Sequence, residues 1–205
     1  MFEMSDTLPE MSRGTTGYVA DYLALLSQLL SHVDTTMVVR VVDLLFTCWQ
    51  NDRRLIFCGN GGSGSTCTHM VCDFQKNLYL EGGKPFEVVS LTDSPALLLA
   101  WSNDTGFTNV FAGQARTWIR PEDVLIALSG SGNSQNVLEA VAVAREVGAT
   151  ALGLCGYGGG KLADACDLAL VVDFNNMQLV EDMQMVLCHI LFSALRDRIT
   201  GALAG

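Results

Sequence analysis

The sequence predicts an α/β protein built on a doubly wound, five-stranded parallel sheet of the flavodoxin-like kind, preceded by a helical hairpin. Short apolar runs alternate with Gly- and Ser-rich loops and with helical segments, which is typical of parallel strands joined by crossover helices. Before the first of these runs, apolar side chains recur only at helical spacing. The 205 residues, 49% of them hydrophobic, suffice for one domain with a substantial core.

The sheet and its helices follow from the positions of these runs. We expect a tail over residues 1–14 and a single domain over 15–205, because no repeat or low-complexity tract interrupts the alternation. The predicted strands span residues 55–58, 86–91, 124–128, 151–154 and 168–172. The predicted helices that follow the hairpin span residues 63–78, 95–101, 107–118, 134–147, 160–165 and 178–200.

The hairpin is predicted over residues 15–52, where the helical spacing is broken near 31–35. Its second half is apolar around much of its circumference, from Val38 to Phe46. Such a helix packs either against a partner subunit or inside its own domain. The pattern alone leaves both possibilities open.

Composition excludes several classes of protein. A net charge of −10 and only 12 Lys and Arg, scattered along the chain, argue against a nucleic-acid surface. No stretch approaches 18 consecutive apolar residues, and the acidic N-terminus is unlike a secretory signal. The seven cysteines mostly lie in apolar runs without a CxxC pair, as reduced core residues do. We therefore expect a cytoplasmic protein with neither membrane nor nucleic acid as a partner.

Two loops of related chemistry follow predicted strands, GNGGSGS at 59–65 and SGSGNS at 129–134. In a parallel sheet both open at the carboxyl edge, where ligands bind. Glycines let backbone N–H groups approach an anion, the next helix offers its positive N-terminus, and serine hydroxyls donate to phosphate oxygens. The pair of loops predicts a phosphate cradle that needs no lysine.

Two alternatives compete with the cradle. Each loop alone is equally consistent with a tight turn that ends in a serine N-cap. Gly59, Gly61 and Gly64 also satisfy the G-x-G-x-x-G pattern of dinucleotide-binding proteins. That pattern requires an acidic residue about 20 positions further on. The nearest suitable one, Asp93, lies well beyond that distance, so we expect no nucleotide cofactor.

Histidines and acids recur together on two predicted helices. His69 and Asp73 are spaced i, i+4 on the helix that leaves the first loop. Glu181 and His189 lie eight residues apart on the last helix, on roughly one stripe. If these helices meet, the four side chains suit a divalent metal of the zinc kind, or equally general acid–base catalysis. The alternative is a helix pair with a satisfied core histidine on each side.

The chain resembles the SIS (sugar isomerase) domain family, and within it the phosphoheptose isomerase branch, over residues 23–196. The motifs that carry the resemblance are FCGNGGSGSTCTHMVCDF, SNDTGF, LSGSGNSQNVLEAVAVARE, GLCGYGGGKLADACD and VEDMQMVLCHIL. Members of this branch are tetramers built partly through their N-terminal helices. The resemblance therefore implies a homotetramer that binds a sugar phosphate.

The resemblance also implies a role for individual residues. Asp73 and His189 take the catalytic positions, and His69 and Glu181 complete the metal set with them. Asn103 and Asp104 would lie near the sugar hydroxyls, and Glu181 would also bind the substrate. The implied phosphate- and substrate-binding residues of the two loops are Asn60, Gly61, Gly62, Ser63, Ser129, Ser131 and Ser134.

Several positions depart from the family pattern. Asp73 is one methylene shorter than the usual Glu, and Glu181 stands where Gln is common. Gly130 replaces a threonine of the phosphate loop and so removes a hydroxyl. The basic residue usual after the catalytic carboxylate has only Lys76 or Asn77 as candidates. These changes keep the acid–base and metal-binding groups but alter their reach and charge, so they affect which substrate is bound more than which reaction is catalysed.

The resemblance implies an aldose–ketose isomerase that converts sedoheptulose 7-phosphate to D-glycero-D-manno-heptose 7-phosphate. Asp73 would carry the carbon-bound proton and His189 would serve the oxygens. If a metal is bound, Asp73 either alternates between ligand and base or leaves the proton transfer to Glu181. The alternative is a non-catalytic member of the family, either a sugar-phosphate sensor or a DnaA-binding adaptor of replication initiation, which has no need of the His and acid set.

Overall fold

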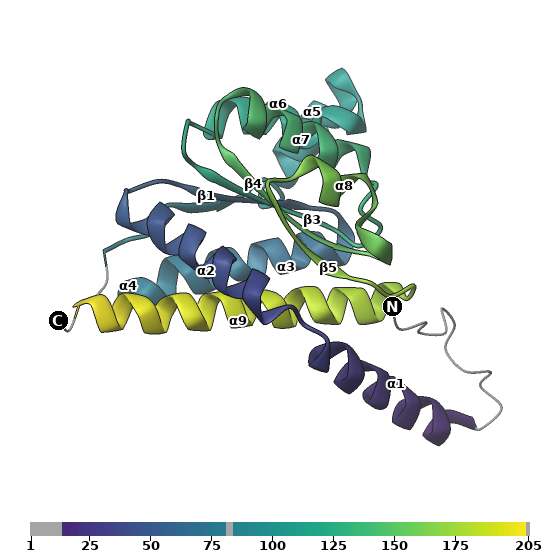
Figure 1. Ribbon diagram of the computed structural model, residues 1–205. Coiled ribbons are helices and arrows are strands. Elements are labelled where there is room, and N and C mark those ends of the chain that lie inside the picture. The colour runs from purple at the N-terminus through teal and green to yellow at the C-terminus, as the bar shows by residue number, and fades with distance from the viewer. Residues whose placement is uncertain (1–13, 81–83, 204–205) are drawn as a thin grey trace.

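The computed structural model describes residues 14–80 and 84–203, and its centre is a five-stranded sheet in which every neighbouring pair is parallel (Figure 1). The strand order is β2-β1-β3-β4-β5, so the chain winds outward in both directions from β1. The predicted fold class is confirmed. The strands are β1 (Leu55–Gly59), β2 (Val88–Ser90), β3 (Val124–Ser129), β4 (Thr150–Gly156) and β5 (Leu168–Val172).

Helices cover both faces of the sheet (Figure 1). Along β1 the side chains alternate: Leu55 and Phe57 enter one core, and Ile56 and Cys58 enter the other. The first core lies under α2 (Thr35–Gln50), α3 (Gly61–Cys72) and α9 (Met177–Leu203). The second lies under α5 (Pro95–Thr105), α6 (Val110–Trp118), α7 (Gln135–Glu146) and α8 (Gly160–Ala165).

The helix predicted over 63–78 contains a feature that the periodicity does not reveal. After α3 the chain widens into a π-helical turn over Asp73–Asn77 and then continues as α4 (Leu78–Leu80). Turns of this kind are rare and occur frequently at functional sites. The π turn begins at Asp73, the carboxylate singled out in the sequence.

The N-terminal arm consists of the two predicted helices, but they do not fold back on each other. α1 (Gly14–Ser31) extends away from the body of the protein, whereas α2 runs across it (Figure 1). Asp34 caps α2 by accepting a hydrogen bond from the Met37 N–H at 3.0 Å. The hydroxyl of Tyr22 ties α1 to α9 by donating to Asp182 at 2.6 Å. The predicted tail lies outside the described residues except for Gly14.

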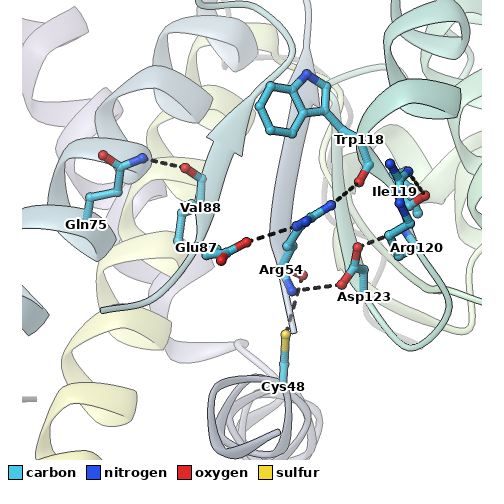
Figure 2. Close-up of polar contacts among 9 residues, drawn as sticks. All are labelled: Cys48, Arg54, Gln75, Glu87, Val88, Trp118, Ile119, Arg120 and Asp123. Carbon is cyan, nitrogen blue, oxygen red and sulfur yellow. Dashed lines mark hydrogen bonds and ion pairs between the residues drawn. The ribbon is translucent and has the colours of Figure 1, made fainter. Parts of the chain in front are cut away.

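A polar cluster fixes the strands at the edge opposite the loops (Figure 2). The Asp123 carboxylate is 2% exposed and accepts the backbone N–H groups of Arg54 and Arg120, both at 2.8 Å. The Arg54 guanidinium bonds Glu87 at 2.9 Å and the Trp118 carbonyl at 3.0 Å. These contacts join the starts of β1 and β3 and the segment before β2. The register of the strands, and with it the position of the loops, is set from this edge.

Most cysteines are buried, as predicted, and all seven have free thiols. Burial raises the pKa of the Cys48 and Cys188 thiols to about 12, and it raises the pKa of Cys58 and Cys67 as well. Cys72, on the last turn of α3, is exposed. Separately, within residues 14–80 and 84–203 we find no helix long and apolar enough to cross a membrane.

We predict that an aromatic disulfide reagent modifies one thiol per native chain rapidly at pH 8, at Cys72. Only thiolates react, and the buried thiols with raised pKa values form almost none at this pH. The measurement is the fast phase of absorbance release, with Cys72→Ser as the control. A second fast equivalent, or a fast phase that survives Cys72→Ser, would contradict this account of the core.

Candidate functional site

The first loop connects β1 to α3 at the carboxyl edge of the sheet. Asn60 is the N-cap of α3, but its side chain forms no capping hydrogen bond. Its amide is instead paired with the Asn136 amide in two hydrogen bonds, of 2.9 and 2.8 Å. Gly61 follows with a φ of +52°, a value that favours glycine, and no atom lies within 4 Å of the position a Cβ would take. The start of α3 is therefore open.

The second loop connects β3 to α7, beside the first because β1 and β3 are neighbours. Gly132 has a φ of +65°, and a Cβ there would lie 2.0 Å from the Gly159 carbonyl oxygen. The Gly132 carbonyl also accepts the Leu162 N–H at 2.9 Å. The loop is thus braced against the glycine-rich segment that follows β4.

The two loops leave the first turns of α3 and α7 free of side-chain caps. By contrast, Asp34 caps α2 and Ser94 caps α5 through their own side chains. At α7 the N-cap is Ser134, whose hydroxyl accepts from Ser129 at 3.1 Å and makes no cap bond. Uncapped first-turn N–H groups and the positive helix ends suit an anion. The predicted anion cradle therefore has a physical basis in a chain of net charge −10.

The serines of the cradle differ in what they can offer. Ser131 accepts the Asn133 N–H at 3.2 Å, so its own proton is free for a ligand, and both Ser131 and Ser134 are half-buried. Ser129 is 3% exposed and gives its proton to Ser134. Ser63 is also 3% exposed and donates to Gln184 at 2.8 Å. The sequence predicts the same ligand-binding role for all four serines, whereas in the structure the Ser63 hydroxyl proton is already bonded to Gln184 on α9.

Two histidines and one carboxylate meet where α3 packs on α9. The Nε2 atoms of His69 and His189 lie 2.9 Å apart. The Asp73 Oδ2 atom lies 3.4 Å from the first and 3.7 Å from the second. Both histidine side chains are 47% exposed and that of Asp73 is 18% exposed, so solvent and small ligands reach the group. Three of the four residues singled out as metal ligands therefore converge.

Glu181 lies elsewhere. Its carboxylate packs against Gly62, where a Cβ would be 2.3 Å from the nearer oxygen. It does not belong to the cluster of potential ligand atoms formed by His69, Asp73 and His189. The reason is that α3 and α9 run parallel, so Glu181 faces the start of α3 while His189 faces its end. Glu181 is thus nearer the anion loops than the histidines, and a carboxylate there interacts favourably with the helix N-terminus.

The remaining predicted residues lie on α5. Asn103 and Asp104 occupy its last turn, both exposed, and the Asn103 amide donates to the Asp104 carboxylate at 2.8 Å. Within the described residues, neither side chain hydrogen-bonds to the two loops. A cleft of about 370 Å³ does open between the first loop and this region, lined in part by Asn60, Thr68 and Phe107.

Three polar residues hold the site together; the sequence reasoning misses Asn136 and Gln184, and it names Asn77 only as a candidate for the basic residue of the family. Asn136 pairs with Asn60, and Gln184 joins Ser63 to the Leu154 carbonyl, which it reaches at 3.0 Å. Asn77 donates to the Asp73 Oδ1 atom at 3.3 Å from the end of the π turn. A polar residue on an otherwise apolar helix face is the only signal for Asn136 and Gln184. The position of Asn77 depends on the π turn, which has no sequence signal.

Fold and site together define a class of protein: an α/β domain with two uncapped Gly- and Ser-rich loops at the carboxyl edge of a parallel sheet, and a group of two histidines and one carboxylate where α3 meets α9. The family model described as the SIS domain matches residues 17–156. The chain belongs to the SIS domain family, in its phosphoheptose isomerase branch.

Individual relatives support this assignment. The chain is 39% identical to the phosphoheptose isomerase of Rhodospirillum rubrum over 146 residues, which cover 71% of this chain and 77% of that relative. It is 31% identical to the phosphoheptose isomerase of Trichlorobacter lovleyi over 186 residues, 90% of this chain and 93% of the other. The solved structure of phosphoheptose isomerase from Neisseria gonorrhoeae superposes with a TM-score of 0.81 at 30% identity, covering 88% of this chain and 97% of that one.

We predict that Gly132→Ala is more destabilising than Gly148→Ala and also weakens phosphate binding. Both glycines have positive φ values, +65° and +81°, but only at Gly132 would a Cβ meet another atom within 4 Å. Gly148→Ala should therefore cost only the backbone strain, roughly 1–2 kcal/mol. Urea unfolding and calorimetric titration with inorganic phosphate measure the two effects. Equal losses of stability with unchanged phosphate affinity would contradict the bracing of the second loop.

Proposed function

We propose that this protein is an aldose–ketose isomerase of sugar phosphates, and that its substrate is sedoheptulose 7-phosphate, converted to D-glycero-D-manno-heptose 7-phosphate. The proposal rests on one observation. The group of His69, Asp73 and His189 lies where α3 packs on α9, and α3 itself begins at the first uncapped loop. A phosphate held at the loops leaves the other end of the sugar free to reach that group. The phosphoheptose isomerases to which the chain is similar agree with this choice.

The isomerisation moves one proton between carbons and one between oxygens. A base removes a proton from C1 of the ketose, the enediolate forms, and the proton returns at C2, while the proton of the C1 hydroxyl passes to the C2 oxygen. We assign the carbon proton to the Asp73 carboxylate and the oxygen protons to the His189 imidazole. The exposure of both side chains permits contact with the sugar.

The same residues fit a divalent cation. Donors bound to a tetrahedral zinc at about 2.1 Å lie about 3.4 Å apart, and the three separations here are 2.9, 3.4 and 3.7 Å. We propose zinc, held by His69, Asp73 and His189. When bound, such an ion supplies positive charge for the enediolate oxygens. Asp73 then alternates between the roles of ligand and base, because Glu181 packs against Gly62 and lies outside this group.

The non-catalytic alternatives receive less support. A sensor or an adaptor needs the anion cradle but no reactive group beside it. Here both histidines and Asp73 are present and mutually within contact distance. The two relatives described above, 39% and 31% identical to this chain, are phosphoheptose isomerases. We therefore retain the isomerase as the proposed function.

We predict that the purified protein forms aldose from sedoheptulose 7-phosphate, and that Asp73→Asn and His189→Ala each lower kcat about 100- to 10,000-fold. Asp197→Asn, an exposed acid further along α9, is the matched control and should leave kcat unchanged. Wild-type protein that turns over no five- to seven-carbon sugar phosphate, with or without zinc, would contradict the isomerase. Metal analysis of the same proteins is a second readout: a bound divalent ion should be lost in Asp73→Asn and kept in Asp197→Asn.

We further propose that residues 15–205 form one domain and that the protein is a cytoplasmic homotetramer. The arm supports assembly, because α1 stands away from the body and exposes Val19 (51%) and Leu23 (60%) (Figure 1). Light scattering on the full chain should give four copies, and Leu23→Glu should reduce that number. A wild-type monomer would contradict this proposal without affecting the proposed chemistry.

A further inference from the structure

The amide pair between Asn60 and Asn136 joins the two anion loops across the sheet edge. Asn60 belongs to the first loop, and Asn136 lies in the first turn of α7, directly after the second loop. Each amide donates once to the other and accepts once from it, at 2.9 and 2.8 Å. Within the described residues, no other side-chain hydrogen bond links the two segments. Beyond the β1–β3 ladder, which pairs Gly59 with Leu128, the loops are therefore held together by two mutually dependent bonds.

Burial makes the pair hard to break. The Asn136 side chain is 3% exposed and has no other hydrogen-bond partner among the described residues. If Asn60 turned away, the Asn136 amide would be left buried and unpaired, which is costly. Asn60 also gives up the capping bond that its position favours. The backbone N–H groups of α3 thereby remain available, while the half-buried Asn60 amide keeps one N–H and one lone pair for a ligand.

We propose that Asn136 is a positioning residue for substrate binding. It holds Asn60 and the first loop at a fixed separation from the second loop, so that the two loops meet the phosphate group as one preformed site. Asn136 itself touches neither the reacting atoms nor the phosphate. The proposal rests on the proposed function only in naming the ligand as a phosphorylated one, since preorganisation of the loops acts on any phosphate bound between them.

The test is a double-mutant cycle on phosphate affinity in the full chain. Asn136→Ala and Asn60→Ala should each weaken binding of inorganic phosphate about tenfold in calorimetric titration, and the double variant should be no weaker than the poorer single variant, because either change breaks the same pair. With sedoheptulose 7-phosphate, Asn136→Ala should raise KM with little change in kcat, the signature of lost uniform binding. Asn136→Asp preserves volume but sets a carboxylate oxygen against the Asn60 Oδ1 atom, so it should weaken phosphate binding at least as much.

Gln114→Ala is the matched control. Gln114 is a similarly buried amide, 5% exposed, that bonds the Leu91 and Val110 carbonyls away from the loops. It should lower the melting temperature and leave phosphate affinity within about twofold. Additive effects in the cycle, unchanged affinity in both Asn136 variants, or an equal loss in Gln114→Ala would each overturn the proposal. Because phosphate binding needs no turnover, a protein without isomerase activity can still pass this test.

Discussion

The parallel packing of α3 on α9 is the contact on which the arrangement of the site depends. It is held in the middle by Gln184, fully buried, which accepts the Ser63 hydroxyl and donates to β4. Because α3 and α9 run in the same direction, the start of α3 packs against the start of α9, and residues further along α3 contact residues further along α9. Glu181 thus meets Gly62, and His189 meets His69 and Asp73. The first uncapped loop and the group of His69, Asp73 and His189 therefore lie at opposite ends of α3.

The sequence was sufficient for the fold and for the position of the loops. Strand-like apolar runs and helical periodicity are local signals, and the rule that parallel strands open their loops at one edge converts them into a site. It also predicted that His69 and Asp73 share one face of the helix after the first loop, and left open whether that face meets the last helix. That succeeded because i, i+4 spacing fixes a common face on any helix, whatever it packs against.

Other features depend on packing that no local pattern encodes. The π turn at Asp73–Asn77 arises inside a segment whose spacing reads as ordinary helix. Ser63 looks like any loop serine until α9 is in place to receive its hydroxyl. Glu181 and His189 lie on one face of α9, so the sequence predicts that they meet at one site. They are about two helical turns apart along α9, however, and contact different parts of α3. Spacing along one helix predicts which residues share a face, but not which of them reach the same site along the helix axis.

The contact between Gly132 and Gly159 has a consequence for how this protein varies over evolution. A side chain at Gly132 would enter the Gly159 carbonyl, and one at Gly160 would lie 2.8 Å from the Gly132 carbonyl. Neither Gly132 nor Gly160 has room for a side chain while the other segment stays in place. The second loop and the glycine-rich turn after β4 therefore form one heritable unit: they are expected to diverge together or not at all, although Gly132 and Gly159 are 27 positions apart in the sequence.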